Sequence, residues 1–72
     1  MNYTILVRPA QEGGYWTEVP ALSGCFSQGE TVEEAIENTR DAIMCYTAAL
    51  REDGVEVTGD DGFLIAHVNV AA

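Results

Sequence analysis

The stretch that decides the fold is residues 31–54, which read TVEEAIENTRDAIMCYTAALREDG. Thr31 and Glu34 form a capping box, in which the Thr31 hydroxyl accepts from the Glu34 amide and the Glu34 side chain reaches back to the Thr31 amide. Gly54 supplies the left-handed residue that ends many helices. The residues at i, i+3, i+4 and i+7 spacing share one face: Val32, Ala35, Ile36, Thr39, Ala42, Ile43, Tyr46, Ala49 and Leu50. The sequence therefore predicts one amphipathic helix over about residues 32–53.

Three extended segments precede this helix, Tyr3–Arg8, Tyr15–Val19 and Cys25–Gln28, and Gly13-Gly14 makes the first turn. A last extended run, Phe63–Val70, follows the helix. The predicted fold class is α+β, with two layers and the element order β-β-β-α-β. A three-stranded antiparallel meander is followed by a crossover helix and a fourth strand parallel to the first, which gives the sheet order 3-2-1-4.

The composition narrows the function. The chain has 72 residues, twelve carboxylate side chains, three arginines and no lysine, and its formal net charge is −9. So short a chain forms one domain with a thin core. Its negative field opposes approach to phosphate backbones and anionic membranes, so we expect neither direct nucleic-acid binding nor membrane binding. No signal-peptide pattern is present at the start, which favours a cytoplasmic protein.

No catalytic, metal or cofactor site is predicted. His67 is the one histidine and lies on the last strand, and nothing local marks Cys25 or Cys45 as an activated thiol. Both cysteines are expected to be free, as is usual in the cytosol. Asp60-Asp61-Gly62 lacks the alternating ligands of a calcium loop and predicts a turn.

Two surfaces stay apolar after the core is assigned, and the first is the outward face of the helix. Carboxylates on this face, among them Glu37 and Asp41, are mixed with Met44, Cys45 and Ala48, which form an apolar patch in the second half of the helix. One interpretation is a covering loop or the ordinary scatter of exposed apolar residues. The other is a subunit or partner contact with a rim of carboxylates.

The second surface is the face of the sheet away from the helix, because one helix covers only one face. Strand alternation places Leu6, Trp16 and Ile65 there, if the helix-facing set is Ile5, Val7, Ala66 and Val68. Trp16 either shields the sheet or anchors an interface, where tryptophan is enriched. A homodimer through this face or through the last strand would cover it.

Motifs in the first half of the chain go beyond these general signals: Gly13-Gly14-Tyr15, Val19-Pro20-Ala21-Leu22-Ser23-Gly24-Cys25 and Gln28-Gly29-Glu30-Thr31-Val32-Glu33-Glu34-Ala35. With this order and spacing, the chain strongly resembles the HicB family of antitoxins. The positions that carry the resemblance are Gly14, Tyr15, Pro20, Gly24, Cys25, Gly29, Thr31, Glu34 and Ala35.

The resemblance implies a single HicB-like domain over residues 1–72, with a partly degraded RNase H-like fold. Many HicB antitoxins also carry a C-terminal DNA-binding domain, and we expect none in this sequence, which has no further helix and no basic patch before Ala72. The resemblance also implies an antitoxin of a type II toxin-antitoxin system that binds and occludes a basic, RNA-cleaving HicA-like toxin. The acidic charge fits this function, because an acidic protein can be steered onto a basic RNA-binding surface.

The sequence also bears on two other function classes, a nuclease and an orphan structural or regulatory protein. A two-metal nuclease needs carboxylates that converge from the first strand, the helix and the last strand, whereas the first strand offers Arg8 and the last offers His67 and Asn69. The sequence therefore does not favour an enzyme. The alternative to the antitoxin is an orphan HicB-like structural or regulatory protein with no toxin partner, and we expect a homodimer or higher homo-oligomer.

Overall fold

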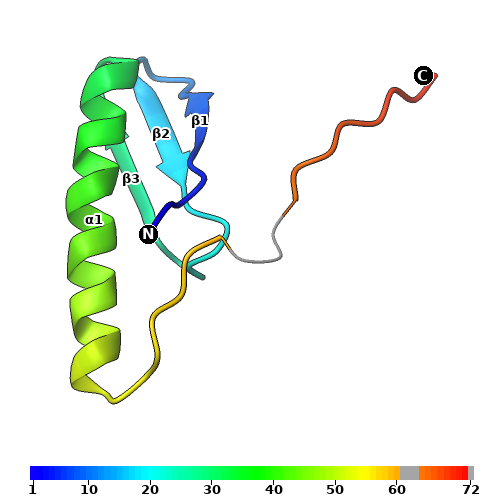
Figure 1. Ribbon diagram of the computed structural model, residues 1–72. Coiled ribbons are helices and arrows are strands. Elements are labelled where there is room, and N and C mark those ends of the chain that lie inside the picture. The colour runs from blue at the N-terminus through cyan, green and yellow to red at the C-terminus, as the bar shows by residue number, and fades with distance from the viewer. Residues whose placement is uncertain (61–63, 72) are drawn as a thin grey trace.

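The computed structural model describes residues 1–60 and 64–71 of the chain. Three strands precede one helix: β1 Leu6–Pro9, β2 Tyr15–Glu18, β3 Phe26–Gly29 and α1 Val32–Glu52. The strands form one antiparallel sheet in the order β1-β2-β3 (Figure 1). Helix α1 packs mainly against β3 and β2, on one face of this sheet. This α+β arrangement confirms the predicted meander and the helix that follows it.

Helix α1 begins where it was predicted, with one difference in its capping box. The Thr31 hydroxyl accepts from the Glu34 amide at 3.1 Å. The Glu34 carboxylate accepts from the amide of Glu30 at 2.9 Å, one residue before the predicted donor. The helix ends at Glu52, and Gly54 adopts the predicted left-handed conformation with φ +74°. Thus the Glu34 side chain connects the turn before the helix to the first turn of the helix.

The apolar core lies between the sheet, the loop after β2 and the helix. Its buried side chains include Val19, Leu22 and Cys25, and Ile43 and Tyr46 of α1 pack against them. The buried apolar residues of the described chain are Val19, Leu22, Cys25 and Ala35, and none of them is aromatic. The core is therefore as thin as the chain length predicts.

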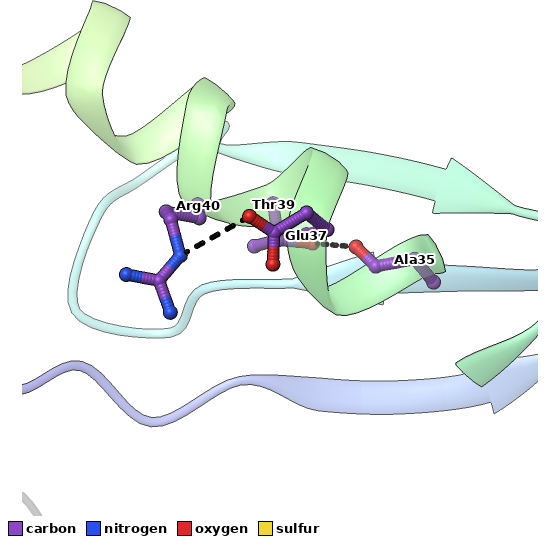
Figure 2. A network of polar contacts seen from close by, with 4 residues as sticks. All are labelled: Ala35, Glu37, Thr39 and Arg40. Carbon is purple, nitrogen blue, oxygen red and sulfur yellow. Dashed lines mark hydrogen bonds and ion pairs between the residues drawn. The ribbon is translucent and has the colours of Figure 1, made fainter. Parts of the chain in front are cut away.

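A polar pair joins the sheet to the helix. Thr17 of β2 and Thr39 of α1 are both fully buried, and their hydroxyl oxygens are 2.5 Å apart. Thr39 donates to the carbonyl of Ala35 at 2.6 Å (Figure 2), so Thr17 donates to Thr39. Because each hydroxyl has a partner, the two polar groups are buried without the penalty of an unpaired donor.

After α1 the chain returns to the segment that precedes β1. The amide of Asp60 donates to the carbonyl of Asn2 at 3.2 Å. The Thr4 hydroxyl donates to the Asp60 carboxylate, and the Tyr3 hydroxyl donates to the carbonyl of Thr58, both at 2.7 Å. These bonds occupy the start of the predicted first strand, and β1 begins only after them.

The described residues do not show the predicted fourth strand or the sheet order 3-2-1-4. Residues 64–71 are assigned to no strand and lead away from the sheet (Figure 1), while Phe63 lies outside the described residues. A strand needs a neighbour for its backbone hydrogen bonds, and this segment does not run beside β1. The predicted turn at residues 60–62 also lies partly outside the described residues.

Candidate interaction surfaces

The sheet face away from α1 gathers bulky and charged side chains. Thr17 contacts the helix, so its neighbours in β2, Trp16 and Glu18, point to the opposite face. Residues paired across neighbouring strands point to the same face. The pairing then defines a surface that we name the open sheet face: Leu6, Arg8, Trp16, Glu18, Phe26 and Gln28. Leu6 and Trp16 lie there as predicted.

The side chains of the open sheet face hold one another in place. The Arg8 guanidinium carbon lies 4.9 Å from the centroid of the Trp16 ring, and Arg8 Nη2 lies 3.7 Å from Glu18 Oε1. The ring centroids of Trp16 and Phe26 are 6.4 Å apart. Cation–π and aromatic contacts of this kind add to burial and limit side-chain freedom. The face is therefore an ordered surface with aromatic character, of which Phe26 remains 55 % exposed.

Phe26 was not among the residues predicted for the open sheet face. The signal was available, because an antiparallel hairpin between the second and third segments sets Phe26 opposite Glu18. The hairpin register depends on the loop between the strands, and that loop includes the buried residues Val19, Leu22 and Cys25. Its conformation follows from packing, which the strand pattern alone does not contain.

The predicted helix patch is exposed along its whole length. All five of its members are exposed: Glu37, Asp41, Met44, Cys45 and Ala48. Glu37 Oε1 lies 3.6 Å from Nε of Arg40 (Figure 2), an exposed pair with little effect on stability. Met44 is 63 % exposed and also borders a second feature, a groove.

This groove lies between α1 and the segment before β1, and we name it the N-terminal groove. Its volume is about 310 Å³. It is lined by Met1, Asn2, Tyr3, Ile5, Ile36, Arg40, Ile43 and Met44. Ile36 belongs to the predicted core face of the helix, yet it is 38 % exposed. The sheet therefore leaves part of the apolar helix face uncovered on the β1 side.

The structure does not bring the predicted interface residues into one site. Leu6 and Trp16 lie on the open sheet face, the helix patch lies on α1, and Ile65 lies in the segment 64–71, where it is 50 % exposed. These are three separate surfaces on the described chain. That any of these surfaces contacts a partner or a second subunit stays a prediction.

The motif residues serve the fold. A Cβ atom on Gly29 would lie 2.5 Å from the amide nitrogen of Ala35, so glycine permits the close approach of β3 and α1. Ala35 and Cys25 are buried, and burial raises the pKa of the Cys25 thiol, which disfavours the reactive thiolate. Gly14 and Gly24 have φ values of +73° and +78°. The remaining motif positions lie in β2, in the loop after it and at the helix cap: Tyr15, Pro20, Thr31 and Glu34.

The described residues, 1–60 and 64–71, lack two other kinds of feature. They contain no group of three or more His, Cys, Asp or Glu side chains placed to hold a metal ion. No helix among them has the length and apolar character needed to cross a bilayer. Both cysteines are free, Cys25 in the core and Cys45 on the surface.

The sequence of the chain is similar to those of known proteins. Residues 3–67 match the family described as the HicB-like antitoxin of bacterial toxin-antitoxin systems. A UPF0150 protein of Thermoplasma acidophilum is 38 % identical over 61 residues, which cover 85 % of this chain and 88 % of that protein. A UPF0150 protein of Synechocystis sp. is 43 % identical over 60 residues, which cover 83 % and 76 % of the two chains.

Two further comparisons carry the antitoxin name. Antitoxin HicB 1 of Photorhabdus laumondii is 33 % identical over 57 residues, which cover 79 % of this chain and 37 % of that protein. The crystal structure of the N-terminal domain of Burkholderia pseudomallei antitoxin HicB matches with a TM-score of 0.73 at 38 % identity. The match covers 81 % of this chain and 68 % of that one. The chain belongs to the family of HicB-like antitoxins.

Proposed function

We propose that the chain is the antitoxin of a type II toxin-antitoxin system and neutralises a basic, RNA-cleaving HicA-like toxin by binding and occlusion. The observation that carries this proposal is the family match over residues 3–67. In this function the chain is a single domain that acts in the cytoplasm without catalysis and without binding nucleic acid directly.

The charge of the chain supports a basic partner. A net charge of −9 on 72 residues creates a field that attracts a basic protein over several ångströms and raises its association rate. On α1, the exposed carboxylates Glu37 and Asp41 lie in the same helix face as Met44 and Ala48. An apolar centre with a charged rim is the usual composition of a protein interface. We therefore propose the helix patch as the surface that contacts the toxin.

The experiment mixes the purified chain with a HicA-like toxin and measures RNA cleavage. We expect cleavage to stop at an equimolar ratio, and the association rate to fall steeply as salt is raised from 0.1 to 1 M, since the Debye length falls from about 10 to about 3 Å. Unchanged cleavage with an excess of the chain would contradict the proposal.

A matched pair of variants tests the surface. Asp41→Asn removes one charge from the helix patch, and Glu12→Gln removes one charge from the exposed turn before β2. If the patch contacts the toxin, Asp41→Asn slows association and speeds dissociation, whereas Glu12→Gln lowers only the association rate, and by less. Equal effects of the two variants would mean that overall charge acts without this surface.

A second candidate is an orphan HicB-like protein that forms homo-oligomers and has no toxin partner. The observation that favours it is the exposure of large apolar side chains in the C-terminal segment, where Leu64 is 90 % and Val68 is 82 % exposed. Surfaces of this kind are usually covered in an assembly. A chain that self-associates and fails to inhibit any HicA-like toxin would support this candidate over the first.

A further inference from the structure

The C-terminal segment 64–71 has the pattern of a strand with one face to bury. Its even-numbered residues are all apolar: Leu64, Ala66, Val68 and Val70. The large ones are exposed by 74 to 90 %. Its odd-numbered residues include His67 and Asn69, so the other face suits solvent. The segment is thus amphipathic with the period of a strand, yet it pairs with no strand in the described part of the chain.

The N-terminal groove and the edge of β1 together form the matching surface. The order β1-β2-β3 leaves the outer edge of β1 without a neighbouring strand. Beside that edge, Ile36 and Met44 of α1 are 38 % and 63 % exposed and line the groove with Ile5. A strand added at such an edge pairs its backbone with β1 and directs alternate side chains into the adjoining groove.

We propose that residues 64–71 of one copy pair in parallel with β1 of a second copy, with Leu64, Ala66, Val68 and Val70 toward the N-terminal groove. Reciprocal exchange gives a two-fold dimer, in which both grooves and both edges are occupied. Each half of this dimer then has the four-stranded order that the sequence predicts for one chain. The inference concerns the chain alone and does not depend on toxin binding.

Two observations favour a second copy as the occupant. The chain up to Asp60 is tied to Asn2 and Thr4, and from there segment 64–71 leads away from its own sheet (Figure 1), where it is accessible to another molecule. The segment also contains no carboxylate, although the chain carries twelve. It can therefore approach another acidic copy with little like-charge repulsion, and its apolar row matches an apolar groove.

Sedimentation velocity of the full chain at micromolar concentration tests the proposal with a matched pair of variants. Val68→Asp places a charge on the groove face, and Asn69→Asp places the same charge on the other face. We expect dimers for the unmodified chain and for Asn69→Asp, and monomers for Val68→Asp with an unchanged helical circular dichroism spectrum. A monomeric unmodified chain, or equally stable dimers for both variants, overturns the proposal.

Cross-linking between separate chains distinguishes exchange from docking within one chain, and it does so even if Val68→Asp fails to fold. Ile36→Cys and Val68→Cys are made in different chains, each with Cys45→Ser, and the two are mixed and oxidised. Cys25 is buried and does not compete. We expect a covalent heterodimer, with a several-fold lower yield when Asn69→Cys replaces Val68→Cys. If a chain with both cysteines closes on itself as a monomer instead, the proposal is wrong.

Discussion

Residues 1–60, which we name the body, and the C-terminal segment 64–71 both carry a regular apolar pattern, but they differ in how far that pattern is buried. In the body, α1 has an apolar stripe and buries Ala35 and Thr39 against the sheet of the same chain. Segment 64–71 has an equally regular apolar pattern, yet Leu64 is 90 % and Val68 is 82 % exposed. The pattern therefore specifies which face of an element is buried, but it does not specify which molecule covers that face.

The difference in burial follows from the length of the connection that precedes each element. Helix α1 is fixed at its start by Thr31, Glu34 and Glu30, and β3 reaches it through a short turn. A connection of this length leaves little choice of partner for the helix. Between α1 and the segment 64–71, the described residues 53–60 lie in no helix or strand, and such a connection permits docking on another copy as readily as on its own chain.

The largest expected effect comes from Gly29, where the body is most tightly packed. A Cβ atom there would lie 2.5 Å from the backbone of Ala35, so Gly29→Ala must separate β3 from α1. We expect the free energy of unfolding to fall by about 2 kcal/mol or more, as in other overpacked cores. Urea denaturation measures the loss. Val70→Ala, studied at a concentration where the chain is monomeric, is the control and should leave the midpoint unchanged.

The buried threonine pair should give the next largest effect. Thr39→Val removes the hydroxyl to which Thr17 donates and leaves a buried donor without a partner, which costs about 1–3 kcal/mol. The double variant with Thr17→Val removes both hydroxyls, so its loss should be smaller than the sum of the two single losses. Additive losses in the double-mutant cycle would show that the two hydroxyls do not act as a pair.

The helix cap should give a smaller effect. Thr31→Ala removes the acceptor for the Glu34 amide, and loss of such a cap costs about 1 kcal/mol. Thr31→Ser keeps the hydroxyl and should retain most of the stability. Thermal unfolding monitored by circular dichroism compares the two variants. An equal loss for both would mean that the methyl group of Thr31, rather than its hydroxyl, stabilises the helix.

These residues also show how much of the molecule could be predicted from its sequence. The start of α1 was predictable because the cap and the apolar period are both local signals, and Leu6 and Trp16 were placed correctly by strand alternation. The amide that donates to the Glu34 carboxylate was not predictable. The amides of Glu30 and Thr31 are both close to it, and only the geometry of the turn selects Glu30. The position of the last segment was not predictable, because strand pairing is a contact between residues far apart in the sequence and residues 64–71 are assigned to no strand.

The smallest expected effect is that of salt, and it separates the two proposed interfaces by sign. Each copy carries a net charge of −9, so dimer formation brings like charges together, whereas a basic toxin is attracted. Between 0.1 and 1 M salt, screening should lower the dissociation constant of the dimer by several-fold and slow the association with the toxin. Sedimentation and stopped-flow fluorescence measure the two quantities.

Val68→Asp should stay monomeric at both salt concentrations and yet keep the salt dependence of toxin association, because its groove-facing charge lies outside the helix patch. A dimer that dissociates in high salt would instead require ion pairs between copies, which the uncharged rows of segment 64–71 do not supply.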